Sequence, residues 1–370
     1  MVSMNPFDRF GLTENPFGIV PVKGLKVWAD RKKFLSEVEE VIRSALSSTP
    51  SRLVACFHGD WGAGKTHSAV YFSNREVLRR YAAELGEKDP LSTVIILPVR
   101  DVFDTLYLDI LEEIGFDAIR KAVDSLRKGS EPLSAEFIAK LRRIVEDEKL
   151  AKVLAMSPDD IEKYVVMSAA TADLRRMRVT RGVRTSSDKL RVLRGVLNLL
   201  TNTLHSRIIL WIDDCERLGE LTGRDQLDFQ VFVRDLLDYV PLCLNIILNF
   251  TLPPGQKVED IEVYLGDALR SRLHRRIVVG PLAANEFIEY VRDLLESKRP
   301  VGFENPNPYF PFKSEKVLLR VSRLMRQRRL SLTPRAVNSL LSSFLEEASR
   351  DEKRTVIDTK FVDTAMRKIM

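Results

Sequence analysis

The feature that most constrains this chain is the run at residues 59–66, which reads Gly-Asp-Trp-Gly-Ala-Gly-Lys-Thr. It fits the pattern G-x-x-x-x-G-K-[ST], in which glycines let the backbone curl so that several N–H groups point at one anion. A short apolar run at residues 53–57 precedes it, as expected of a buried parallel strand. Residues 65–84 follow it, lack proline and glycine, and carry strong helix formers. A strand, a glycine loop and a helix in this order predict a phosphate-binding loop in an α/β protein.

The loop indicates which residues would hold a nucleoside triphosphate. Lys65 is expected to place its ammonium against the β- and γ-phosphates, and Thr66 to offer its hydroxyl to Mg²⁺. The dipole at a helix N-terminus disfavours a lone cation, so an anion beside Lys65 is the better explanation of its position. The alternative is an ordinary glycine-rich turn between a strand and a helix. The residues expected to bind ATP are Gly59, Asp60, Trp61, Gly62, Ala63, Gly64, Lys65, Thr66 and His67.

A second apolar stretch, residues 207–212, ends in the acidic pair Asp213 and Asp214. An acid after a buried strand is where a P-loop enzyme holds its Mg²⁺, so we expect Asp213 to coordinate the ion. Asp214 is expected to orient or activate the attacking water. Glu216 is a competing base, although a surface role fits it equally well. The alternative for the acidic pair is a solvated turn.

Composition limits the class of protein. The chain has 370 residues, of which 45% are hydrophobic and 30% charged, as in soluble globular proteins of two or three domains. No apolar run reaches the roughly 18–20 residues that span a membrane, and the N-terminus lacks the pattern of a secretory signal. Three widely separated cysteines fit a reducing compartment. We therefore expect a cytoplasmic protein without a membrane partner. Arginine exceeds lysine and glutamine is scarce, which tilts the interpretation toward a thermophile.

Helices and strands alternate up to about residue 280, and only helices are predicted after it. Besides the two apolar stretches above, strands are predicted at residues 93–97, 242–248 and 276–279. Helices are predicted at residues 30–47, over most of 102–204, and near 285–298, 314–328, 334–349 and 359–369. Ser157 and Pro158 mark one helix start, and Ser187 with Asp188 marks another.

With these motifs in place, the chain resembles the AAA+ ATPases. Within them it is similar to the archaeal origin-recognition initiators and the related transposition-helper and secretion-associated ATPases. The resemblance extends over about residues 30–370, and it is carried by three features beyond the loop and the acidic pair. Asn249, at the end of strand 242–248, takes the place of sensor 1. Arg272, in the Ser-Arg segment at 270–282, matches the arginine finger, with Arg270 as the runner-up. Arg335, after Thr333 and Pro334, matches sensor 2 in the lid.

The resemblance implies an α/β fold: a P-loop NTPase (AAA+) parallel sheet with a long helical insertion, followed by a small all-α lid domain. Residues 1–30 would be an N-terminal extension, 31–280 the nucleotide-binding domain and 281–370 the lid. Asp213 follows Lys65 by 148 residues, more than in compact AAA+ proteins, which places the insertion at about residues 102–186. Asp214 stands where many members have glutamate. Initiators usually carry a winged-helix domain after the lid, where this sequence ends.

The resemblance implies a Mg²⁺-dependent ATPase that forms a homo-oligomer and acts on DNA or on a DNA-bound protein. Two arginine clusters would contact nucleic acid through its backbone, without sequence preference, because no aromatic residues are interleaved with them. The clusters are Arg175, Arg176, Arg178, Arg181, Arg184, Arg191 and Arg194, and Arg320, Arg323, Arg326, Arg328 and Arg329. The alternative function is a defence-type signalling or scaffold ATPase with little turnover and a protein partner on the insertion. A small-molecule kinase is a third, weaker possibility.

Overall fold

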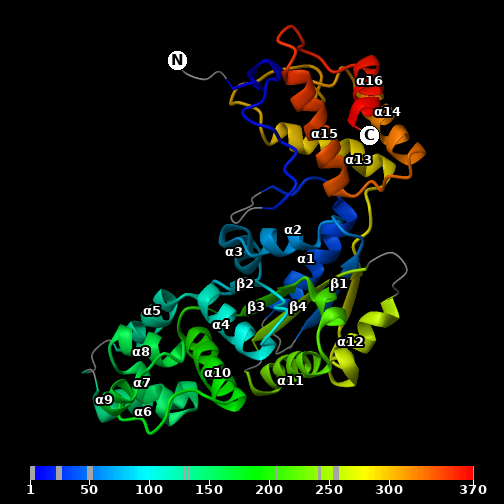
Figure 1. Ribbon diagram of the computed structural model, residues 1–370. Helices are drawn as coiled ribbons and strands as arrows, with labels where there is room; N and C mark the ends of the chain where they lie inside the picture. Colours follow the sequence, from blue (N-terminus) through cyan, green and yellow to red (C-terminus); the bar gives the residue numbers. More distant parts are fainter. Residues whose placement is uncertain are drawn as a thin grey trace. The chain divides into compact units, whose positions relative to one another are not determined.

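The computed structural model describes residues 5–21, 27–47, 53–127, 131, 133–205, 207–240, 243–252 and 258–369. The chain forms two compact units (Figure 1). The sheet unit contains Glu40–His58 and Phe72–Ile277. The loop–lid unit contains Met1–Glu39, Gly59–Tyr71 and Val278–Met370, so the glycine loop groups with the C-terminal helices. The predicted domain boundaries at residues 30 and 280, and the insertion limits at 102 and 186, stay predictions.

The sheet has five strands in the order β2-β3-β4-β1-β5. Strands β2, β3 and β4 pair in parallel, so their carboxyl ends open at the same edge. Every residue of β1 and β3 is buried, because apolar strands covered by helices on both faces have no solvated side. The parallel α/β prediction is confirmed. The strands are β1 (Val54–Gly59), β2 (Leu91–Ile96), β3 (Ile208–Asp213), β4 (Leu244–Thr251) and β5 (Arg275–Val278).

Two predicted elements near the candidate site differ from the structure. The helix predicted over residues 65–84 is two helices, α2 (Lys65–Phe72) and α3 (Arg75–Glu84). Asn74 separates them because its side-chain oxygen caps the second helix, accepting a hydrogen bond from the N–H of Glu76 at 2.9 Å. Strand β4 runs two residues past Asn249, so this side chain lies within the strand rather than at its end.

The helices between β2 and β3 share one continuous apolar core with the sheet. In Figure 1, helices α5 to α9 gather at one end of the sheet unit, and α4 packs against β2. Helix α10 packs against α4, α5, α6 and α11, which ties this end to the rest of the unit. The predicted insertion is therefore not a separate globule. The helices between β2 and β3 are α4 (Val102–Ile114), α5 (Phe116–Arg127), α6 (Ala135–Val145), α7 (Glu148–Leu154), α8 (Pro158–Val165), α9 (Thr171–Arg176) and α10 (Ser186–Thr203). Helix α11 (Gly223–Tyr239) follows β3, and α12 (Val258–Arg270) follows β4.

Capping residues define these helices locally. Helix α8 begins as predicted, with Ser157 as its cap and Pro158 in its first turn. Helix α10 begins at Ser186, one residue before the predicted pair, because Thr185 and Asp188 form a reciprocal capping box. The hydroxyl of Thr185 accepts from the N–H of Asp188, and the carboxylate of Asp188 accepts from the N–H of Thr185, both at 3.1 Å.

Asp188 also has a role in the stability of the connection between α9 and α10. Its buried carboxylate accepts hydrogen bonds from the guanidinium groups of Arg181 and Arg191. Burial raises the pKa of Asp188, but the hydrogen bonds from Thr185 and its other donors outweigh burial and hold the pKa well below 3.8. The carboxylate is therefore ionised throughout the neutral range.

We expect Asp188→Ala to lower the free energy of unfolding by about 2–4 kcal/mol, because it removes a helix cap and leaves two guanidinium groups without their partner. Urea unfolding followed by circular dichroism would measure this loss. A depressed folded-state pKa stabilises the protein above the unfolded-state value. The difference between wild type and variant should thus be full at pH 7 and shrink as the pH falls below about 4. Asp117→Ala, at an exposed ion pair with Arg120, should change little; an equal loss in both variants would contradict the assignment.

The loop–lid unit has its own core, built from α13 (Ala284–Glu296), α14 (Glu315–Gln327), α15 (Pro334–Ser349) and α16 (Thr359–Ile369). These four helices confirm the prediction for the C-terminal part. The N-terminal segment belongs to the same core, since Phe10 and Phe17 are buried in it and Asn15 donates to Ser342 at 2.8 Å. A short 3-10 helix, Asp8–Phe10, lies in this segment. Over the part of the chain that the structure describes, no helix is long and apolar enough to cross a membrane.

Candidate nucleotide-binding site

The glycine loop leaves strand β1 at Gly59 and enters helix α2 at Lys65. The ammonium of Lys65 is buried and donates to the carbonyl oxygens of Gly59 and Asp60, each at 2.9 Å. Glycine is needed at two loop positions for steric reasons. A Cβ on Gly59 would lie 2.1 Å from the carbonyl oxygen of Val279, and Gly62 adopts a φ of +75° that side chains disfavour. The loop thus has the compact, curled backbone that an anion site requires.

The predicted lid cation, Arg335, lies directly on this loop. Its N–H donates to the carbonyl oxygen of Gly62 at 3.2 Å, and a Cβ on Gly62 would lie 2.6 Å from the Cβ of Arg335. Its guanidinium carbon lies 4.6 Å from the centre of the Trp61 ring. Helix α15 begins just before it as predicted, with Thr333 as its cap and Pro334 as its first residue. The fold therefore brings Arg335 to the first half of the glycine loop.

Arg31 is a residue of this site that the sequence analysis missed. It is 6% exposed, and its guanidinium donates to the carbonyl oxygens of Ala63 and Gly280, the latter at 2.8 Å. It stacks on Phe34 at 4.5 Å and forms no ion pair with any described residue. Burial lowers its pKa. In sequence Arg31 stands between Asp30 and Lys32, where nothing distinguishes it from a solvated charge.

The predicted loop residue His67 lies among aromatic rings. Its ring centre is 5.6 Å from that of Trp28, which also packs against Tyr71 at 5.2 Å. Burial lowers the pKa of His67 to about 4, so its imidazole is neutral at pH 7. Its side chain thus packs against Trp28, and a contact between His67 and nucleotide stays a prediction. Thr66, the second residue of α2, is half-buried.

The sheet unit holds the predicted metal ligand Asp213 and the predicted sensor 1 residue Asn249. The amide of Asn249 donates to the carboxylate of Asp213 at 3.0 Å, from adjacent strands β4 and β3, and both side chains are buried. The amide oxygen of Asn249 is buried and accepts no hydrogen bond from the described residues. Because β3 and β4 are neighbouring parallel strands, this pair lies at the carboxyl edge of the sheet. The pair supplies the oxygen acceptors that a hydrated Mg²⁺ prefers.

The two candidate bases differ in their contacts. Asp214 has a left-handed backbone, with φ +56°, and its carboxylate accepts from Arg217 at 2.9 Å. Glu216 accepts from the N–H of Thr251 at 2.9 Å and so ties the turn after β3 to the end of β4. This contact favours a structural role for Glu216. Both catalytic assignments stay predictions.

The candidate arginine finger folds back onto its own unit. One nitrogen of Arg272 lies 3.0 Å from both carboxylate oxygens of Asp238, and another donates to the carbonyl oxygen of Ala268 at 2.7 Å. Arg270, the runner-up, lies 3.6 Å from Glu262. A reach by Arg272 to a neighbouring subunit would require its release from Asp238.

No three His, Cys, Asp or Glu side chains form a metal-ligand cluster within the described ranges. Mg²⁺ that is bound together with nucleotide needs only one or two protein ligands beside the phosphates, so such a cluster is not required. Thr66 and Asp213 are ligand types that suit this ion.

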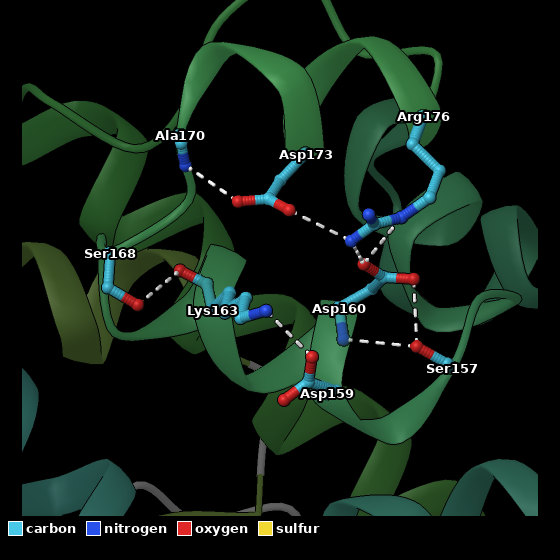
Figure 2. Close-up of polar contacts among 8 residues, drawn as sticks. All are labelled: Ser157, Asp159, Asp160, Lys163, Ser168, Ala170, Asp173 and Arg176. Atoms are coloured by element: carbon cyan, nitrogen blue, oxygen red, sulfur yellow. Dashed lines mark hydrogen bonds and ion pairs between the residues drawn. The ribbon is translucent and has the colours of Figure 1, made fainter.

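The first arginine cluster is largely neutralised by carboxylates. Figure 2 shows the guanidinium of Arg176 between Asp160, at 3.1 Å, and Asp173, at 2.9 Å. Arg181 and Arg191 share Asp188, and Arg194 pairs with Glu146. Arg175, Arg178 and Arg184 are exposed and form no ion pair with the residues described. These three arginines are therefore the members of the cluster whose positive charge is available to bind an anionic partner.

Comparison with known proteins supports the fold. No protein-family model and no curated protein matches the sequence. The Aeropyrum pernix ORC2 protein in its ADPNP–ADP complexes has a TM-score of 0.59 and 13% identity, over 96% of this chain and 71% of that one. The Aeropyrum pernix ORC1 protein in complex with DNA has a TM-score of 0.51 and 16% identity, over 97% and 70%. Drosophila ORC bound to DNA has a TM-score of 0.52 and 11% identity, over 100% and 67%. Similarity at these identities shows a shared fold.

Proposed function

Because the chain has the fold of the AAA+ P-loop ATPases, we propose that it binds ATP at residues 59–66 and hydrolyses it with Mg²⁺. One observation carries the proposal: the lid cation Arg335 sits on the same glycine loop that holds Lys65, within one compact unit. A bound triphosphate explains two cations at a curled backbone far better than a solvated turn does, because its negative charge would balance both of them.

Each remaining residue has a role in this proposal. Lys65 balances the charge of the β- and γ-phosphates, and Thr66 and Asp213 hold Mg²⁺, which neutralises charge on the phosphate oxygens. Asn249, held by its hydrogen bond to Asp213, offers to the attacking water its amide oxygen, which accepts no hydrogen bond among the described residues. Asp214 is the base that orients this water.

The proposal is tested by calorimetry with ATP and ADP and by steady-state phosphate release with and without Mg²⁺. We expect saturable binding of both nucleotides and Mg²⁺-dependent turnover. No detectable heat with any adenine or guanine nucleotide, at protein concentrations suited to micromolar affinity, would remove the basis of the proposal.

We further propose a homo-oligomer that acts on DNA or on a DNA-bound protein. An arginine finger requires a neighbouring subunit, and Arg272 is the candidate for that role. Two proteins of this fold are described in complexes with DNA, which motivates the choice of partner. In this chain the exposed, unneutralised arginines Arg175, Arg178 and Arg184 supply a surface for phosphates.

We expect the triple change Arg175→Gln, Arg178→Gln and Arg184→Gln to weaken binding to duplex DNA. The slope of log affinity against log salt is negative, and each lost phosphate contact makes it shallower by about 0.9. The loss of three contacts should therefore reduce its magnitude by about 3. Fluorescence anisotropy with a labelled duplex at several salt concentrations would measure both effects.

The matched control removes the same charge elsewhere. Arg100→Gln, Arg143→Gln and Arg224→Gln change three exposed arginines outside both clusters. This control should keep the wild-type salt slope. An equal loss in the control would show that net charge rather than this surface determines binding, and no DNA binding by the wild-type protein would remove DNA as the partner.

A second candidate function is a signalling or scaffold ATPase with little turnover and a protein partner on the helical insertion at about residues 102–186. The contacts that favour it are the pairing of Arg272 with Asp238 and of Asp214 with Arg217, since both engage residues that hydrolysis would need. Steady-state turnover discriminates the two functions. Stimulation by duplex DNA supports the first, and negligible turnover with ATP retained through purification supports the second.

A further inference from the structure

Trp61 occupies a position of the glycine loop that the loop pattern leaves free. Its side chain is 72% exposed, so packing of the fold does not require an indole there. The described contact that covers its ring is the guanidinium of Arg335, 4.6 Å from the ring centre. The face of an indole carries negative potential and attracts a cation at this distance.

Arg335 needs a partner because of its place in the helix. It is the second residue of α15, where the helix dipole and unpaired N–H groups disfavour a positive side chain. Its backbone is already tied to the loop through Gly62, at 3.2 Å. The main chain of Arg335 is therefore placed by Gly62 and its side chain by Trp61. Two neighbouring loop residues together fix where the lid cation points.

We propose that Trp61 is a positioning residue that holds the guanidinium of Arg335 for contact with the γ-phosphate and so determines the preference for ATP over ADP. The inference rests on the proposed nucleotide site. ADP lacks the phosphate that Arg335 would contact, so an effect transmitted through Arg335 appears with ATP and not with ADP. A mere change in loop shape would affect both nucleotides, because both place their β-phosphate at Lys65.

The test compares three variants of the full chain by calorimetry with ATP and with ADP. Trp61→Leu keeps an apolar side chain without a ring, Trp61→Ala removes the side chain, and Trp61→Phe keeps an aromatic face. We expect the first two to weaken ATP binding by about three- to thirtyfold and to leave ADP binding unchanged. Trp61→Phe should retain most of the wild-type ATP affinity. Thermal unfolding would confirm that these exposed-site variants are folded.

A double-variant cycle separates this role from others. In an Arg335→Ala background, Trp61→Ala should cause no further loss of ATP affinity, because the residue that it positions is gone. Equal weakening of ATP and ADP, or an undiminished effect of Trp61→Ala in that background, would overturn the inference while the nucleotide site stands. A wild-type protein that binds neither nucleotide would overturn the proposed function first, before any variant is compared.

Discussion

Lys65→Ala should abolish ATP binding under conditions where the wild-type protein is saturated. The ammonium of Lys65 is buried at the glycine loop, where it donates to two carbonyl oxygens at 2.9 Å. Charge-assisted hydrogen bonds to phosphate contribute about 1.5–3 kcal/mol each, so the loss of two contacts lowers affinity at least about a hundredfold. Calorimetry with ATP and ADP would measure it, and both nucleotides should be affected.

The control for this change is Lys121→Ala, which removes the same charge from an exposed position on α5. It should bind ATP as the wild type does. Retained binding by the folded Lys65→Ala protein would show that the anion site is elsewhere, and the assignment of the loop would fail.

Arg272→Ala should spare ATP binding and slow turnover by about a thousandfold or more, the effect typical of an arginine finger. A guanidinium supplied by a neighbouring subunit stabilises charge that develops on the γ-phosphoryl group only during transfer, so the ground-state complex does not need it. Arg270→Ala is the matched control, since Arg270 is two residues away and pairs loosely with Glu262 at 3.6 Å. It should keep at least most of the wild-type rate.

Mixing two inactive variants tests whether the finger acts between subunits. Lys65→Ala lacks a nucleotide site but keeps Arg272, whereas Arg272→Ala keeps its nucleotide site. Mixed oligomers should therefore recover part of the wild-type phosphate release. Wild-type turnover in Arg272→Ala alone would show that the finger assignment is wrong. A slow variant that no mixture rescues would show that Arg272 acts within its own subunit, where it contacts Asp238 in this structure.

Local sequence patterns predicted much of the fold because they report local physics. Apolar runs bounded by turns become buried strands, and cap residues such as Ser157 and Thr333 start helices where they stand. The predictions failed where a single side chain interrupted a favourable run, as Asn74 does between α2 and α3. The start of α10 differs from the prediction because Thr185, rather than Ser187, caps the helix.

Spacing of motifs predicted candidate residues of the site but not the contacts that these residues make in the fold. The fold confirms a parallel sheet with Asp213 and Asn249 on adjacent strands, and it places Arg335 at Gly62. The sequence could not reveal Arg31, because its burial arises from Ala63, Gly280 and Phe34, which are distant or ordinary along the chain. In the same way, the number of charges in the sequence could not show that Arg176 is paired with carboxylates whereas its neighbour Arg175 forms no ion pair with the described residues. The partners of Arg176 are Asp160 and Asp173, which lie on two different helices.

What the sequence determined by itself is the chemistry of the loop at residues 59–66, since a curled backbone with a lysine and a threonine follows from the glycines and their order. It also determined the alternation of strands and helices, because periodicity and caps act over a few residues. Only the tertiary structure decided that Arg335 lies over Trp61, that Arg31 is buried against the carbonyl oxygens of Ala63 and Gly280, and which arginines of the first cluster form no ion pair with the described residues. Such contacts join residues far apart along the chain, and no local pattern records which buried charge will meet which carbonyl or ring.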